Sequence, residues 1–476
     1  MPILLTCIVW RVSGASTHQI RYEELAESVR AVFWFDERQV YDGVYSNVGW
    51  YGTLLVVYKL FGFSLFTAKT VRLVLHLAGL FALVAVLRRS LSSRAAIVPL
   101  LVVGLSPAVI YFDTLQTSYG VDVWYAAIVL ALLLKLQPDL PARRDTLVAA
   151  AIGAVAMLAA MSYPAFLLYV PSLVLTAFWR RVSLRSAGAI GAGALVLLLA
   201  ALVWVQSRAL LLFDPATDAG LCRGGGTFGI DATAIGAALT TTIGDLFVRG
   251  RSYYFDVTQP DFAGIISVCG VFVVVALLVY GLITRAIDRT VLLAAVALVA
   301  ISLLVPGLAG GDPGLRRSTG VLAGFFVLFA LAWRVAVTDR RWPVVGRRAA
   351  IGLCLLVPLG SALKLPSLEA DARRDNPFQN RDWFAIEATP GLSLERLQTD
   401  AASGRTIACP VDAQRRITPC RYQEIYAAIA GYRRWNGLGD GPVRALDWKT
   451  GNEIVLTPRL WLEGYFPTCT RIEACK

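Results

Sequence analysis

The sequence has little charge and almost no histidine. Charged residues make up 16% of its 476 positions and hydrophobic residues 57%, whereas a soluble globular protein carries about a quarter charged residues. This balance excludes a soluble enzyme, a disordered chain and a small secreted disulfide-rich protein. The only histidines are His18 and His76, and no CxxC pair occurs. The scarcity excludes histidine-rich metal catalysis and argues against a zinc site.

Nucleotide-binding and nucleic-acid-binding patterns are also missing. The sequence contains no Walker or Rossmann glycine motif, so nothing in it indicates a bound nucleotide. The net charge is +12, but no loop combines a long basic run with interleaved aromatic residues, which argues against nucleic acid as a partner. The arginine excess instead fits the loops that orient membrane helices. Binding of anionic lipid or phosphate is a second use for it.

Long apolar runs dominate what is present. A membrane-spanning helix needs about 20 mostly apolar residues. The sequence predicts an all-α polytopic membrane protein with about eleven helices, the first of them partial. Residues 1–10 are apolar but half the length of a span, which we attribute to a start codon placed too far downstream or to a half-inserted helix. The ten full runs are residues 70–88, 95–112, 120–137, 145–162, 163–179, 187–206, 263–283, 290–308, 318–336 and 349–365.

The placement of arginine predicts the orientation. Arginine-rich turns alternate with long or poorly basic loops, so we expect these turns to be cytoplasmic. We predict a transmembrane domain over residues 1–365, with external loops at 11–69 and 207–262. We further predict a small extracytoplasmic α/β domain over 366–476, where short runs such as EIVLTP and RTIACP suggest strands. The arginine-rich turns are residues 88–94, 143–144, 179–186, 284–289 and 339–348.

The cysteines agree with this orientation. Four of the eight cysteines lie in the C-terminal tail, which suggests disulfides in an oxidising compartment. The simplest connectivity joins Cys409 to Cys420 and Cys469 to Cys475. Together with the preference for arginine over lysine, this favours the inner membrane of a bacterium with the tail in the periplasm. Three further cysteines lie in apolar runs and are predicted to be small packed core residues: Cys7, Cys269 and Cys354.

The first external loop is rich in carboxylates. Residues 21–34 and 50–62 have amphipathic helical spacing but are too polar to span, so we expect two helices in the interface plane, joined by a turn near residues 41–47. Such carboxylates are either the solvated face of an interfacial helix or part of a site. They are Glu23, Glu24, Glu27, Asp36, Glu37 and Asp42.

These motifs, in this order, resemble the GT-C superfamily of glycosyltransferases. The matching positions are the RYxE motif at residues 21–24, the helix ending in KLFG at 51–62, Arg72, and LSPAVIYFDTLQTSYGVDVWY at 105–125. The nearest types are the protein O-mannosyltransferases and the lipid A aminoarabinose transferases, of glycosyltransferase families 39 and 83. The resemblance covers residues 15–180 by motif and the rest by topology.

The resemblance implies a function. It implies transfer of a sugar from a polyprenyl-phosphate-linked donor to an envelope glycan, lipid or protein acceptor. The transfer would invert the anomeric carbon at the periplasmic membrane face, without a metal or other cofactor. A carboxylate would take the proton of the acceptor hydroxyl, and cations would stabilise the leaving phosphate.

The sequence departs from the family where the catalytic base is expected. The family carries Asp-Glu before its Arg-Tyr, and these positions are His18 and Gln19 here. Three readings stay open. His18 acts as the base, since its ordinary pKa of about 6.5 suits that role; Glu23 or Glu24 supplies the carboxylate; or the chemistry is lost. Asp122 matches a family Asp at a helix start and is a second acidic candidate, with a simple helix cap as the alternative.

The phosphate is expected to meet arginine. The segment GGDPGLRRST places Arg316 and Arg317 at the start of a predicted span, where backbone N–H groups and the helix dipole also favour an anion. Guanidinium groups bind phosphate bidentately, although a lipid-headgroup anchor would look the same. Lys59 and Arg72 are weaker candidates, because snorkelling explains them equally well. His76, inside an apolar run, is predicted to be a packed core histidine.

Two other functions compete with the transferase. A carrier or flippase for a lipid-linked saccharide would show polar groups at mid-membrane and internal repeats, whereas the ionisable residues here gather in the external loops. A non-catalytic binder of a lipid-linked saccharide is supported only by the substitution at His18.

Overall fold

The structure is a computed structural model. It describes residues 1–13, 31, 47–136, 142–207, 233, 236, 240, 262–308, 319–339, 341–373, 407–408, 443–446 and 453–456.

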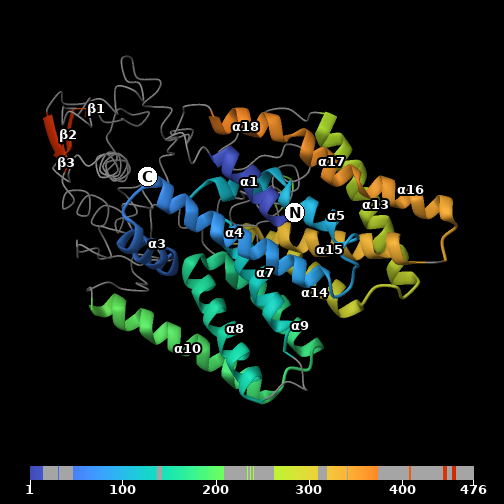
Figure 1. Ribbon diagram of the computed structural model, residues 1–476, viewed down its shortest axis with the longest axis horizontal. Helices are drawn as coiled ribbons and strands as arrows, with labels where there is room; N and C mark the ends of the chain where they lie inside the picture. The colour runs from blue at the N-terminus through green and yellow to red at the C-terminus, as the bar shows by residue number, and fades with distance from the viewer. Residues whose placement is uncertain are drawn as a thin grey trace.

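Helices make up nearly all of the described chain, and they form a bundle of antiparallel and crossing rods (Figure 1). In chain order they are α1 (Pro2–Ser13), α3 (Val48–Phe61), α4 (Leu65–Leu87), α5 (Ile97–Gly104), α6 (Pro107–Thr114), α7 (Val121–Leu133), α8 (Ala142–Ser162), η1 (Pro164–Tyr169), α9 (Val170–Trp179), α10 (Leu184–Ser207), α13 (Phe262–Ile283), α14 (Arg289–Leu308), α15 (Thr319–Thr338), α16 (Val344–Cys354), α17 (Leu356–Leu363) and α18 (Leu365–Arg373).

Every predicted apolar run coincides with helix, but not every run is one long helix. Six described helices are long and apolar enough to cross a membrane, or seven if the bent pair α5 and α6 counts as one span. Two of the runs are interrupted where a proline begins a new helix, because proline cannot continue the backbone hydrogen-bond pattern. Pro107 follows a 56° bend between α5 and α6, and Pro164 begins the 3₁₀ helix η1. The protein is therefore a multi-pass membrane protein whose described spans are fewer than the predicted eleven.

Small residues bring α8 and α10 into direct backbone contact along the lower edge of the bundle (Figure 1). A Cβ atom on Gly153 would lie 1.8 Å from the backbone oxygen of Ile190, and one on Gly193 would lie 2.0 Å from that of Ala150. Only glycine permits this approach, a common way of packing helices in a membrane.

The first helix is short and packed. α1 buries Leu5, Val9 and Val12 against α4 and α6, so the predicted partial helix forms part of the core. The prediction that the apolar-run cysteines are core residues is correct for Cys354 and wrong for Cys7 and Cys269, which are exposed. The latter two lie on outward helix faces, where a membrane protein presents apolar side chains to lipid.

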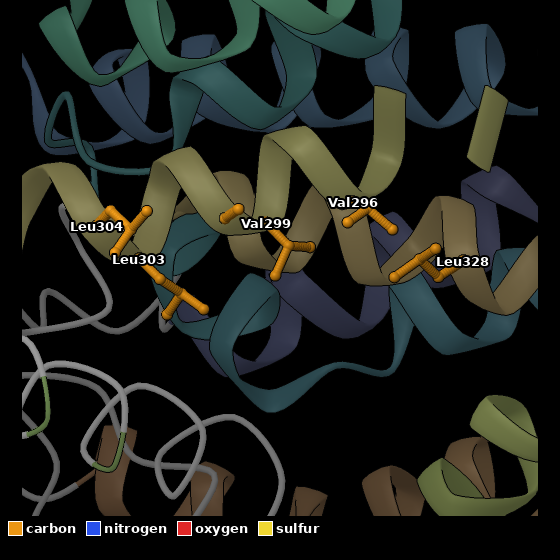
Figure 2. A pocket seen from close by; sticks show the side chains of 6 residues that line it. Val296, Val299, Leu303, Leu304 and Leu328 are labelled. Atoms are coloured by element: carbon orange, nitrogen blue, oxygen red, sulfur yellow. The ribbon is translucent and has the colours of Figure 1, made fainter. Parts of the chain in front are cut away.

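An apolar groove runs between α14 and α15, with a volume of about 350 Å³. Figure 2 shows Val296, Val299, Leu303 and Leu304 of α14 beside Leu328 of α15. The groove is lined without a polar side chain, so it offers a surface for lipid and no group for chemistry.

The described part of the C-terminal tail contains strands. β1 (Ile407–Ala408) pairs parallel to β2 (Val443–Leu446), which pairs antiparallel to β3 (Glu453–Leu456). β1 and β3 lie within the two runs expected to be strands. Helical structure continues through α18 to Arg373, past the domain boundary predicted at residue 366, and the α/β fold of the whole tail stays a prediction.

Candidate functional site

A buried triad of ionisable side chains joins α4 to α6. Arg72 and His76 are one helical turn apart on α4 and therefore share a face. Nη2 of Arg72 lies 3.0 Å from Oδ1 of Asp113 on α6, and Nδ1 of His76 lies 2.6 Å from Oδ2 of the same carboxylate. The indole of Trp124 on α7 donates to Oδ1 at 2.8 Å. Since all four side chains are buried, Asp113 ties three helices together.

Arg72 also holds the loop between α6 and α7, residues 115–120. Its guanidinium donates to the backbone oxygen of Tyr119 at 2.6 Å and to that of Thr117 at 3.4 Å. Gly120 then begins α7 with a left-handed φ of 74°. A Cβ atom there would lie 2.9 Å from Cβ of Phe112 and 3.2 Å from Nη2 of Arg72, so glycine is required for both the turn and the close approach.

The helix α3 packs on the same loop. The indole of Trp50 donates to the backbone oxygen of Gln116 at 3.0 Å, and the hydroxyl of Tyr58 lies 3.4 Å from the Gln116 side-chain oxygen. Nδ2 of Asn47, just before the helix, donates to Ser118 at 2.8 Å. The predicted second helix of the first loop is thus present as α3. It is anchored to the loop that the buried triad holds.

Asp122 links the start of α7 to the start of α15. Its Oδ2 accepts a hydrogen bond from the hydroxyl of Thr319, the first residue of α15. Its Oδ1 is buried, as is the hydroxyl of Tyr169 at the end of η1, and neither makes a hydrogen bond within the described residues. The N-cap of α7 is Gly120, and Asp122 lies inside the first turn. The side chain therefore joins two helices, which the simple-cap alternative did not anticipate.

Unsatisfied polar atoms gather around this cluster. An unpaired polar group in a buried setting costs free energy, so a concentration of them calls for an explanation. In the described part of the chain, the buried atoms without a hydrogen-bond partner include Nε of Arg72, Nε2 of His76, Oγ1 of Thr117 and Oδ1 of Asp122. We therefore take the candidate site to be the polar end of the bundle where α3, α4, α6, α7 and α15 meet around loop 115–120.

The predicted site residues fall into two groups. Arg72 and Asp122 belong to the cluster and are fully buried, and Lys59 lies exposed in the last turn of α3. Arg72 binds Asp113 and loop 115–120, so we assign it a positioning role. His76 is a packed core histidine, as predicted, but with a carboxylate partner. The other predicted residues, which are His18, Glu23, Glu24, Arg316 and Arg317, lie outside the described residues.

Sequence reasoning missed the link between His76 and Asp113. Two features of the sequence could have indicated it. Arg72 and His76 are four residues apart and so share a helix face, and Asp113 lies in the segment 105–125 that resembles the family. No group of three or more His, Cys, Asp or Glu side chains in the described ranges is arranged to hold a metal ion. Metal independence stays a prediction.

The described helices thus form a membrane bundle with a polar cluster at one end, and this fold is similar to that of solved structures. The similar solved structures are two crystal structures of ArnT from Cupriavidus metallidurans. The form bound to undecaprenyl phosphate superposes with a TM-score of 0.58 at 15% identity, over 98% of this chain and 88% of ArnT. The apo form gives 0.53 at 16% identity, over 94% and 87%.

Sequence comparisons add nothing further, since no family model and no curated protein matches the chain. The expected likeness to aminoarabinose transferases of the GT-C superfamily is confirmed for the fold.

Proposed function

We propose that this protein is a membrane glycosyltransferase that moves a sugar from a polyprenyl-phosphate-linked donor to a glycan, lipid or protein acceptor. The observation that carries the proposal is the fold, because 98% of the chain matches an ArnT structure bound to undecaprenyl phosphate. The buried cluster at loop 115–120 adds polar groups at one end of the bundle. A lipid-linked donor needs polar groups at the end of the bundle, since its polyprenyl tail stays in the membrane while its phosphate and sugar lie at the membrane surface.

The proposed reaction is a single displacement. The acceptor oxygen attacks the anomeric carbon, the bond from that carbon to the phosphate oxygen breaks, and polyprenyl phosphate leaves with the electron pair. The anomeric carbon is inverted. The acceptor proton passes to a base, which we assign to Glu23 or Glu24 of the first loop, with His18 and Asp122 as the alternatives. This site faces the periplasm in the proposed orientation.

Arginine is proposed to hold the phosphate. Arg316 and Arg317 precede Thr319 by three and two positions, and Thr319 begins α15 in contact with Asp122. Guanidinium groups suit a phosphate because they donate two parallel hydrogen bonds. Lys59 is a further cation, exposed near the end of α3. Arg72 acts indirectly in this scheme, by fixing the loop on which α3 packs.

The proposal is tested with a panel of radiolabelled polyprenyl-phosphate sugars in membranes. Wild type is compared with Glu23→Gln/Glu24→Gln, and Glu27→Gln is the matched control from the same segment. Label that moves to an acceptor with wild type and the control, but not with the double variant, would support the transferase and its base. Transfer that survives in the double variant would move the base to His18 or Asp122.

Two results would contradict the proposal. Donor binding without transfer to any acceptor would favour a non-catalytic binder, and movement of the intact labelled lipid across the membrane would favour a carrier. The assay is repeated with EDTA, and we expect unchanged transfer because no metal is part of the proposed step.

A further inference from the structure

A second polar site lies at the other end of the bundle. A channel of about 600 Å³ runs between α4, α7, α9, α14 and α15, and most of its lining is apolar. Representative lining residues are Leu87, Leu130, Leu173, Ala295 and Phe326. The channel is therefore suited to hydrocarbon along most of its length.

Three arginines line one end of this channel: Arg89 after α4, Arg180 after α9, and Arg334 in α15. Arg89 lies 17 residues after Arg72, which is about 25 Å along a helix axis at ~1.5 Å per residue. Figure 1 shows α4 crossing the molecule, with α3 near its beginning and α5 beyond its end. The arginines are thus separated from the candidate active site by the length of a span.

Within the part of the chain that the structure describes, these cations lack partners of opposite charge. Among the described residues, no ion pair joins Arg89, Arg180 or Arg334 to a carboxylate. Arg180 donates to the backbone oxygen of Leu136 at 3.4 Å, while its Nε is buried without a hydrogen-bond partner. Asp288 also lines the channel, but its Oδ1 accepts from the first backbone N–H groups of α14, at 2.8 and 3.3 Å.

The first two arginines also influence each other. Partial burial, followed by the nearby charge of Arg180, lowers the pKa of the Arg89 guanidinium from its ordinary value. An anion placed between two like charges relieves their repulsion and supplies acceptors for their N–H groups. The arrangement thus has two features of a phosphate site: two neighbouring arginines that line the same channel, and an unused N–H donor on Arg180.

We infer that this channel binds one anionic phospholipid of the bilayer, with its phosphate at Arg89 and Arg180 and its chains along the apolar lining. Free phosphate would leave the apolar lining uncovered. A neutral lipid would leave the arginines without a counter-charge. The lipid phosphate would bridge α4, α9 and α15 at the end away from the candidate active site, and the chains would extend along the channel toward Tyr169.

Native mass spectrometry of the full chain tests this inference, with phosphatidylglycerol or phosphatidylcholine added to the detergent-solubilised protein. We expect wild type to retain one phosphatidylglycerol. Arg89→Ala/Arg180→Ala should weaken retention about thirtyfold, since each basic residue at a membrane surface contributes roughly fivefold. Arg143→Ala/Arg144→Ala is the matched control, because it removes the same charge from another predicted cytoplasmic turn, outside the channel.

A second variant separates lost binding from lost folding. Ala330→Trp keeps every arginine but fills the channel, and we expect it to lose the lipid while its elution profile stays monodisperse. Equal retention in all variants would overturn the inference, as would equal binding of phosphatidylcholine. Displacement of the lipid by inorganic phosphate would also overturn it, because the chains would then contribute nothing. None of these readouts depends on sugar transfer.

Discussion

Arg72 and Asp113 form an ion pair of 3.0 Å in which both side chains are buried. The pair joins α4 to α6, and the same guanidinium fixes the loop on which α3 packs. A buried ion pair adds little net stability, but a broken one is costly because the remaining charge has no water around it. The candidate site therefore depends on this contact for its geometry.

Removing one member of the pair should destabilise the protein strongly. Asp113→Leu removes the carboxylate that forms the ion pair with buried Arg72, and we expect a loss of about 3–5 kcal/mol. Asp339→Asn, in the turn after α15, is the matched control and should change stability little. The measurement is the fraction of monodisperse protein after a heating series in detergent.

The double replacement Arg72→Met/Asp113→Leu should be less damaging than Asp113→Leu alone, because it removes both charges. If the double variant is instead the less stable of the two, the unpaired charge of Arg72 is not the cause of the stability lost in Asp113→Leu. Sugar transfer should fall in both variants, because the double variant removes the guanidinium that holds loop 115–120 and Asp113→Leu removes the carboxylate that positions that guanidinium.

Gly120 should tolerate alanine less well than Gly62. Both glycines have a left-handed φ, 74° and 88°, but only Gly120 is crowded; nothing lies within 4 Å of a Cβ atom on Gly62. Gly62, with φ 88° and ψ 154°, lies in a backbone region that almost only glycine adopts, and this conformation alone costs about 1–3 kcal/mol, which is our expectation for Gly62→Ala. Gly120→Ala should cost more because Phe112 and Arg72 must also move. Equal losses of thermal stability would contradict the proposed close approach.

The packing of α8 on α10 should depend on one face of α10. Gly193→Ala places a Cβ atom against the backbone of Ala150 and should cost about 1–3 kcal/mol. Gly191→Ala, two residues earlier on the same helix, meets open space and should be neutral or stabilising by up to about 1 kcal/mol. Thermal stability of the two variants, measured side by side, checks this difference; the reverse order would rule out the observed packing.

Two tryptophan replacements should both lower stability, but only the one next to the candidate site should lower sugar transfer. Trp50→Phe leaves the backbone oxygen of Gln116 without its donor, at a cost of about 1–3 kcal/mol, and should also reduce sugar transfer. Trp333→Phe loses an equivalent bond, the 2.7 Å contact to the backbone oxygen of Ala95. This second variant should lose stability alone. The test compares the sugar-transfer rates of the two variants at a temperature where both are folded. Equal rates would show that loop 115–120 is not part of the site.

The sequence predicts where the helices lie because apolar length is a local property. It does not predict that the run at 95–112 bends at Ser106 and Pro107, since proline also occurs within spans. The contact of His76 with Asp113 joins residues 37 positions apart, and it depends on how α4 crosses α6. Asp122 was identified by its place in a motif, but its bond to Thr319, across 197 positions, follows only from tertiary packing.

The proposed reaction requires that sugar leaves its lipid phosphate at this protein. A decisive assay uses purified wild type in proteoliposomes, with a donor labelled in both the sugar and the polyprenyl chain, and follows the two labels separately. We expect sugar on an acceptor in an amount equal to that of the free polyprenyl phosphate released. Donor that stays intact, whether bound or moved to the opposite leaflet, would contradict it.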